Sequence, residues 1–150
     1  MATTTVTAIR AALETTIAGF TCAGAAMGTG SYAVASGFEE WSERNSGDVD
    51  RQFSIGSVDP SNPLEFGVTS EVLLDGSMEL EIGHMKSGDV DSGRDRRDDD
   101  VAQLATELIS KVNYPSGVYL IEVTGVDHED YEEEFWISTI TFRLMYARAT

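Results

Sequence analysis

Residues 66–82, FGVTSEVLLDGSMELEI, carry the clearest strand pattern in the sequence. Apolar side chains recur at every second position, which is typical of strands with one buried and one solvated face. They are Phe66, Val68, Val72 and Leu74, followed after a short interval by Met78, Leu80 and Ile82. The dipeptide Asp75-Gly76 between the two sets favours a tight hairpin turn. The stretch therefore predicts an antiparallel hairpin that turns at Asp75-Gly76.

Two helices are expected outside this hairpin. The first, about Thr5–Ala18, has apolar residues at spacings of three and four, and Thr4 or Thr5 can cap it. The second, about Asp99–Val112, reads DDVAQLATELISKV and has an almost continuous apolar face. Aspartates at its start and Lys111 near its end suit the helix dipole.

Further strands are expected on both sides of the second helix. Before it, a strand over Arg51–Val58 is expected to end at Pro60 and Pro63, and a short strand is possible near Tyr32–Val34. After it, strands are expected over Val118–Thr124 and about Phe135–Ala147. The predicted fold class is α+β, a mostly antiparallel sheet of about four to five strands with two main helices packed on one face.

The size and composition favour one domain over residues 1–150. The chain has 41% hydrophobic residues, which is enough for one core. Its single cysteine, Cys22, cannot form an internal disulfide. Arg10 and Glu14 interrupt the N-terminal apolar pattern, so neither a secretory signal nor a membrane span is expected.

The net charge of -16, from 26 acidic and 10 basic residues, disfavours binding to a phosphate backbone. Two explanations of this acidity remain open. Carboxylates can keep a protein soluble in high salt, or they can prevent adhesion to a polyanion.

No catalytic residue, metal ligand or cofactor site is predicted. The segment Asp89–Asp100 resembles a calcium loop, but it has Gly93 and Arg94 at the fifth and sixth positions and lacks the final Glu. His128-Glu129 begins like a zinc motif, yet the other histidine, His84, lies far away in the sequence. Neither histidine has a sequence context that makes it a base for Cys22.

Two charged segments are candidates for contacts. Residues 86–100 are expected to form an exposed, mobile loop, and its Arg94, Arg96 and Arg97 are candidate subunit-interface residues. Residues 127–134 are expected to form an acidic loop between strands that faces solvent, a partner or a channel. Its acids are Asp127, Glu129, Asp130, Glu132, Glu133 and Glu134.

The chain resembles the tail terminator and tail-completion proteins of long-tailed bacteriophages over about residues 5–147. The resemblance rests on the order of elements rather than on a short diagnostic motif. The segments that carry it are Thr7–Leu13, Arg51–Phe53, Arg94–Asp98, the helix Val101–Val112, Pro115–Val118 and the closing strand Ile140–Tyr146. The Gly/Ala-rich stretch Cys22–Gly37 has no counterpart in this layout.

The resemblance implies a virion structural protein of the tail or neck, made in the host cytoplasm, with no enzymatic activity. Such a subunit would form a homo-oligomeric ring, of six copies, that caps the tail tube protein and joins it to a head-tail connector or stopper protein. DNA would pass through an acidic lumen without specific binding. Two alternatives stay open: another neck component, or a small acidic enzyme or ligand-binding module of a halophile.

Overall fold

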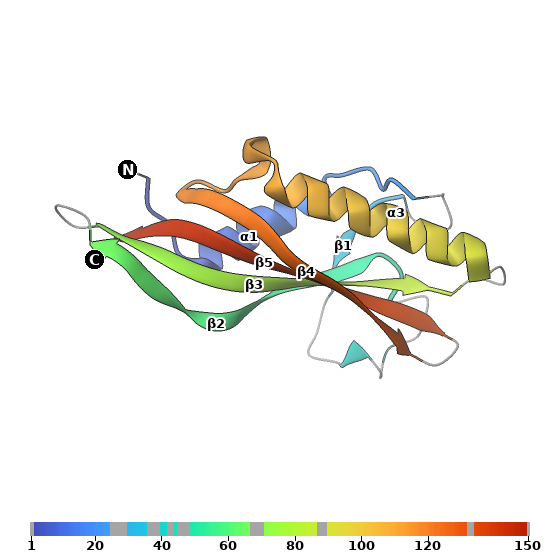
Figure 1. Ribbon diagram of the computed structural model, residues 1–150. Helices are drawn as coiled ribbons and strands as arrows, with labels where there is room; N and C mark the ends of the chain where they lie inside the picture. The colour runs from blue at the N-terminus through green and yellow to red at the C-terminus, as the bar shows by residue number, and fades with distance from the viewer. Residues whose placement is uncertain are drawn as a thin grey trace.

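The computed structural model describes residues 2–24, 30–35, 40, 41, 44, 49–66, 71–86, 90–131 and 134–149. Its elements, in chain order, are α1 (Val6–Ala18), β1 (Ala33–Val34), β2 (Gln52–Phe66), β3 (Glu71–Met85), α3 (Val90–Ile109), the 3-10 turn η2 (Lys111–Asn113), β4 (Val118–Tyr131) and β5 (Phe135–Ala149). The predicted α+β class is confirmed. Both helices lie on the same face of one long, twisted sheet (Figure 1).

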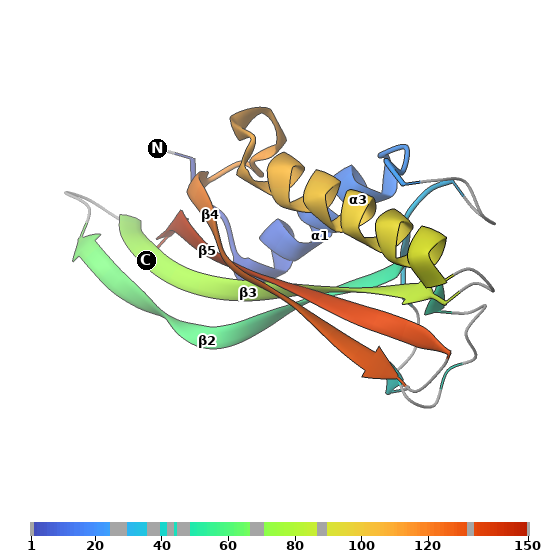
Figure 2. The ribbon, with the colours of Figure 1, turned by 45° about the vertical axis from the view of Figure 1, so that its right-hand side comes forward.

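The five strands are ordered β1-β2-β3-β5-β4, and only the short β1–β2 pair is parallel. The centre of the sheet is the β3–β5 pair, which aligns Glu71 with Ala149 at one end and Met85 with Phe135 at the other. The β2–β3 and β4–β5 hairpins extend in opposite directions, as the turned view shows (Figure 2). Because β4 is last in the strand order and, among the described strands, pairs only with β5, it is an edge strand of the sheet.

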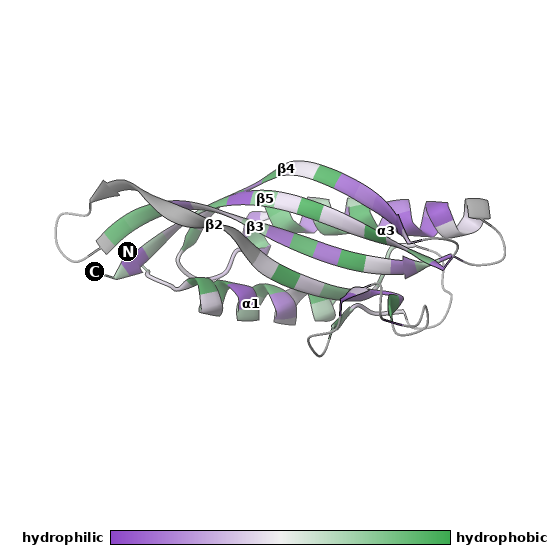
Figure 3. Ribbon diagram, turned by 90° about the horizontal axis from the view of Figure 1, so that it is seen from below, coloured by the Kyte–Doolittle hydropathy of each residue, from purple (hydrophilic) through white to green (hydrophobic). Residues whose placement is uncertain are grey.

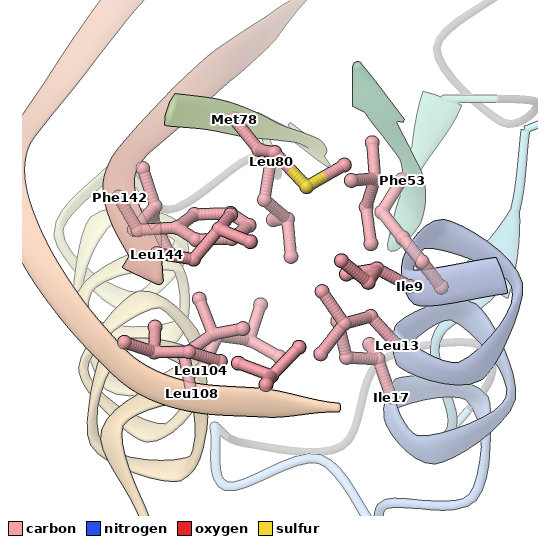
Figure 4. Packing of buried hydrophobic residues seen from close by; sticks show 14 of the residues in the cluster. Ile9, Leu13, Ile17, Phe53, Met78, Leu80, Leu104, Leu108, Phe142 and Leu144 are labelled. Carbon is pink, nitrogen blue, oxygen red and sulfur yellow. The ribbon is translucent and has the colours of Figure 1, made fainter. Parts of the chain in front are cut away.

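The core fills the space between the helices and the sheet (Figure 4). α1 begins after Thr5, whose hydroxyl accepts a hydrogen bond from the Ala8 N–H at 3.1 Å. It buries Ile9, Leu13 and Ile17, which confirms the first predicted helix. The strands contribute alternate apolar residues to the same layer, as Figure 3 shows by hydropathy along the sheet.

The predicted turn at Asp75-Gly76 is wrong, because both residues lie inside the continuous strand β3. Gly76 pairs with Leu144 of β5, and the Asp75 carboxylate accepts a hydrogen bond from Arg143 Nε at 2.8 Å. Phe66 pairs with Val72, so the hairpin partners are β2 and β3. A long neighbouring strand thus overrides the local turn preference.

The predicted end of the second strand at Pro60 and Pro63 is also wrong, because β2 continues to Phe66. β2 has a partner beyond Phe53 only on its β3 side within the described residues, so a proline here removes no central ladder bond. The register shifts at Ser57/Asp59, Asp59/Asn62 and Pro63/Glu65 fall around the two prolines.

Two predicted loops are largely regular structure. α3 begins at Val90, so most of the expected mobile loop over residues 86–100 is helix, although the second helix itself is confirmed. β4 continues to Tyr131, so most of the expected acidic loop is strand paired with β5. In both cases contacts with distant parts of the chain stabilise a helix or strand whose polar sequence has little intrinsic propensity for that structure.

Candidate functional site

The N-terminal half of α3 covers a cluster of buried charged residues, which we call the polar cluster. It consists of Asp50, Arg51, His84, Arg96 and Asp100, whose exposed fractions are 6%, 1%, 0%, 2% and 0%. Asp100 and Arg96 come from α3, and His84 comes from β3. Asp50 and Arg51 directly precede β2. The cluster therefore joins a helix, a strand and a connecting segment at one end of the sheet.

Asp100 is the hub of the cluster. Its Oδ1 accepts hydrogen bonds from the Gly24 N–H at 2.7 Å and from an Arg51 terminal nitrogen at 3.2 Å. Its Oδ2 accepts one from Arg51 Nε at 2.8 Å and lies 2.7 Å from His84 Nε2. Arg51 also donates to the Gly24 carbonyl oxygen at 3.1 Å. One carboxylate thus fixes the positions of three separate segments.

The surroundings of Asp100 favour its ionised form. Burial alone would raise the pKa of this carboxyl, but hydrogen bonds from His84, Arg51 and the Gly24 N–H outweigh it and lower the pKa to about 2. Asp100 is therefore a stable anion at neutral pH.

Asp50 and Arg96 form a second buried pair. The two terminal nitrogens of Arg96 each donate to one Asp50 oxygen at 2.7 Å, a bidentate geometry. Asp50 Oδ1 also accepts from the Met85 N–H at 3.1 Å. The pair ties α3 to the chain segment that enters β2 and to the end of β3.

Arg51 holds a backbone conformation that is uncommon for a side chain of its size, with φ at 56°. Its N–H donates to the Gly83 carbonyl oxygen at 2.7 Å, and its guanidinium is held by Asp100 and Gly24. These contacts offset the strain, which costs on the order of 1–3 kcal/mol.

Position 24 requires glycine because the backbone of α3 packs directly against it. A Cβ at this position would lie 2.5 Å from the Arg96 carbonyl oxygen and 2.8 Å from Asp100 Oδ1. We expect Gly24→Ala to lower the free energy of unfolding by about 1–3 kcal/mol, because backbone must move to accept the methyl group. Urea unfolding followed by circular dichroism measures this. Gly30→Ala is the matched control, since its Cβ would meet nothing within 4 Å; equal losses for both variants would contradict the steric explanation.

A second layer of polar contacts lies beside the cluster. Gln103 Oε1 accepts from the Tyr32 hydroxyl at 2.6 Å and from the Ala23 N–H at 3.0 Å, and its Nε2 donates to the Thr21 carbonyl oxygen at 2.8 Å. Burial raises the pKa of the Cys22 thiol above its ordinary value, which favours the protonated thiol over the nucleophilic thiolate.

At the outer end of the cluster, cations lie over an aromatic ring. Arg97 and Lys86 lie 4.9 and 5.1 Å from the centre of the Trp136 ring. Lys86 pairs with Asp130 of β4 at 2.5 Å, and Arg97 pairs with the neighbouring Asp98 at 2.9 Å. These contacts join β4, β5 and α3.

The polar cluster has residue types that are common in catalytic sites, but its side chains are buried away from solvent. His84 and Asp100 are fully buried, and the acceptor positions of Asp100 are occupied by protein donors. No group of three or more His, Cys, Asp or Glu side chains in the described part of the chain is placed to hold a metal ion. The geometry is that of a structural clamp.

The three candidate interface arginines have different environments. Arg94 is exposed, whereas Arg96 and Arg97 have exposed fractions of 2% and 9%. The expectation that all three lie on a solvated loop is therefore wrong. Arg96 is held inside the subunit by Asp50, whereas Arg94 is exposed at the surface.

The acidic residues of segment 127–134 are divided between the two faces of the sheet. Asp127 and Glu129 point away from the helices, and Asp130 pairs with Lys86 on the helix side. Glu134 lies in the turn before β5, while Glu132 and Glu133 are outside the described residues, as are residues 25–29 and 36–37 of the Gly/Ala-rich stretch.

The face of the sheet without helices is acidic. Within the described side chains, the residues that alternate outward on β3, β4 and β5 include six acids and one base, Arg143. The acids are Asp75, Glu79, Glu81, Glu122, Asp127 and Glu129. At one end of this face, Val49 packs with Phe135 and Ile137, and Trp41 Nε1 donates to Glu81 Oε2 at 2.5 Å.

Sequence comparisons leave the family open. Neither the family models nor the curated proteins that were searched match this chain. Within the described residues, none of the helices combines the length and the apolar character needed to cross a membrane.

Proposed function

We propose that the chain is a virion structural protein of the tail terminator type. In this proposal its copies form a ring, of six subunits, between the tail tube protein and a head-tail connector or stopper. The function is mechanical, with no cofactor and no catalysis, and the protein resides in the tail or neck of the virion.

The observation that carries the proposal is the acidic, helix-free face of the sheet. Among the side chains that the structure describes, six carboxylates and one guanidinium face outward from β3, β4 and β5, while both helices cover the other face. A surface of this kind repels a phosphate backbone, as the wall of a channel for DNA requires. We assign this face to the lumen, with Asp127 and Glu129 in the wall.

The outer strand β4 supplies a second feature that suits assembly. Its 14 residues leave backbone groups on one edge that a neighbouring subunit can pair with. Part of the edge is already covered, since the Ile121 N–H donates to the Tyr114 hydroxyl at 3.1 Å. Arg94 remains a candidate contact with an acidic neighbour.

The main alternative from another class is a small acidic enzyme or ligand-binding module. The apparent lack of converging titratable groups counted against it in the sequence, but the structure brings such groups together. The burial of these groups supports the structural role over the enzymatic one, because His84 and Asp100 are fully buried. The other alternative, a different neck component, shares the ring architecture.

We expect the purified protein to assemble into a discrete ring when salt screens its acidic surface. Light scattering at about 0.1 M and about 1 M KCl tests this, because the screening length falls from about 10 to about 3 Å. Electron microscopy of the assembled fraction should show a closed ring of about six subunits with a central hole. A strict monomer in both salts, at all protein concentrations, would contradict the proposal.

A further inference from the structure

The edge of β4 is divided into a covered half and a free half. In the first half, the Ile121 N–H donates to the Tyr114 hydroxyl at 3.1 Å, and the Tyr119 hydroxyl donates to the Ala2 carbonyl oxygen at 3.0 Å. From Gly125 to Asp130, by contrast, every residue is exposed. Among the described residues, only those of β5 hydrogen-bond to the backbone of this segment. We call Gly125–Asp130 the free edge.

The free edge is already ordered as a strand by its pairing on one side. It continues along β5 without a register shift as far as Tyr131, which pairs with Phe135. The nearest register shift lies before it, between Val123 and Gly125. A further extended segment can therefore add to the sheet through main-chain hydrogen bonds, and β4 itself needs little additional ordering.

The side chains of the free edge alternate between the two faces of the sheet. Val126 pairs with Ile140 of the core, lies on the helix side and is 47% exposed. Asp127 and Glu129 lie on the helix-free face. A strand added beside β4 continues the pleat, so its alternate side chains would meet Val126 on one face and the two acids on the other.

The charges on the two faces differ in whether the subunit itself neutralises them. On the helix side, Asp130 pairs with Lys86 at 2.5 Å. On the helix-free face, neither Asp127 nor Glu129 forms an ion pair with a residue that the structure describes. The base on the described part of this face, Arg143, is engaged by other carboxylates. A partner strand can therefore supply lysine or arginine on the helix-free face.

A second copy of this chain does not supply that positive charge. Its β4 carries the same acids, and its β2, toward the other side of the sheet, has Asp59 and Glu65 and no base in its sequence. Like charges that lie directly opposite each other on two strands are destabilising. This repulsion agrees with the expectation that a ring forms when salt screens the acidic surface. At low salt the chemistry of the free edge fits a different protein.

We propose that the free edge binds an extended, basic segment of another protein as an additional strand of the sheet. The segment carries lysine or arginine at alternate positions, facing Asp127 and Glu129, and an apolar residue beside Val126. Main-chain hydrogen bonds provide the pairing, and the alternating side chains provide the specificity. This inference does not depend on the proposed function, because it requires neither the ring nor the lumen.

The probe is a synthetic peptide, Lys-Val-Lys-Val-Lys-Val-Lys, whose affinity is measured by titration calorimetry at about 0.05 M KCl, where surface charge is weakly screened. We expect Asp127→Asn/Glu129→Gln to weaken binding by about tenfold, as the loss of two cross-strand charge pairs implies. The matched control Asp95→Asn/Asp99→Asn removes the same charge from exposed positions of α3, and it should weaken binding by less than about twofold. Circular dichroism checks that both variants are folded.

N-methylation of the peptide separates strand pairing from simple attraction between charges. One peptide is methylated on its lysines and another on its valines, because alternate residues of a strand direct their N–H groups to opposite edges. One of the two should bind like the unmodified probe, and the other should bind at least about tenfold less tightly. Equal affinity of the two methylated peptides, equal weakening in the two double variants, or no binding of the probe to the native protein would overturn the proposal.

Discussion

Replacement of Asp100 by Ala should lower the free energy of unfolding by about 3–5 kcal/mol, the usual cost of leaving buried charge unpaired. The variant removes every acceptor at the hub of the polar cluster. Arg51 would keep a buried guanidinium without its carboxylate, and the Gly24 N–H would lose its partner. For a domain of this size, such a loss is a large part of the total stability.

Chemical unfolding of Asp100→Ala beside Asp99→Ala measures this effect. Asp99 is exposed and adjacent in the same helix, so its replacement should change stability by less than about 0.5 kcal/mol. Asp100→Asn separates charge from volume, because it keeps the size of the side chain. Similar stabilities for Asp100→Ala and Asp99→Ala would show that the cluster does not hold the fold.

The decrease in the free energy of unfolding at acid pH should depend on the carboxyl group of Asp100. Its pKa of about 2, against an ordinary 3.8, corresponds to about 2 kcal/mol. Because the folded-state pKa is lowered, this contribution is present above about pH 4 and is lost as the pH falls toward 2. In Asp100→Asn the contribution should be absent, so the stability difference between the two proteins should shrink over this interval.

Local patterns predicted the elements that bury a regular apolar stripe. α1, the C-terminal part of α3 and the alternation in β3 and β5 follow directly from residues such as Leu13, Leu104 and Ile140. The elements that were missed have polar sequences whose partners lie far away in the chain. The start of α3 depends on Asp50 pairing with Arg96, and the end of β4 depends on Phe135 pairing with Tyr131.

The sequence contains a weak indication that Asp100 and His84 are buried charged residues. Asp100 lies four residues before Leu104, on the apolar face of the helix, and His84 has the strand parity of Ile82 and Leu80. A charged residue at a core position indicates a buried partner. The identity of that partner could not be predicted, because Arg51 and Gly24 approach Asp100 only after the whole chain has folded.

Replacement of Arg96 by Ser should also cost about 3–5 kcal/mol, because Asp50 would remain buried without its bidentate partner. The sequence alone would place Arg96 with Arg94 on a surface loop, where the same change has little effect. Thermal and urea unfolding of the two single variants distinguish these environments. Arg94→Ser should keep the stability of the native protein, since its side chain is exposed.

The double variant Asp50→Ser/Arg96→Ser identifies the cause of that loss. If the loss comes from an unpaired buried carboxylate, removing Asp50 as well should recover part of it. A double variant whose loss equals the sum of the two single losses would contradict the pairing. The loss of stability in Arg96→Ser also affects how the subunit interface is tested. A variant that replaces Arg94, Arg96 and Arg97 together would fail to assemble because the subunit unfolds. Arg94→Ser alone tests the surface contact in a folded subunit.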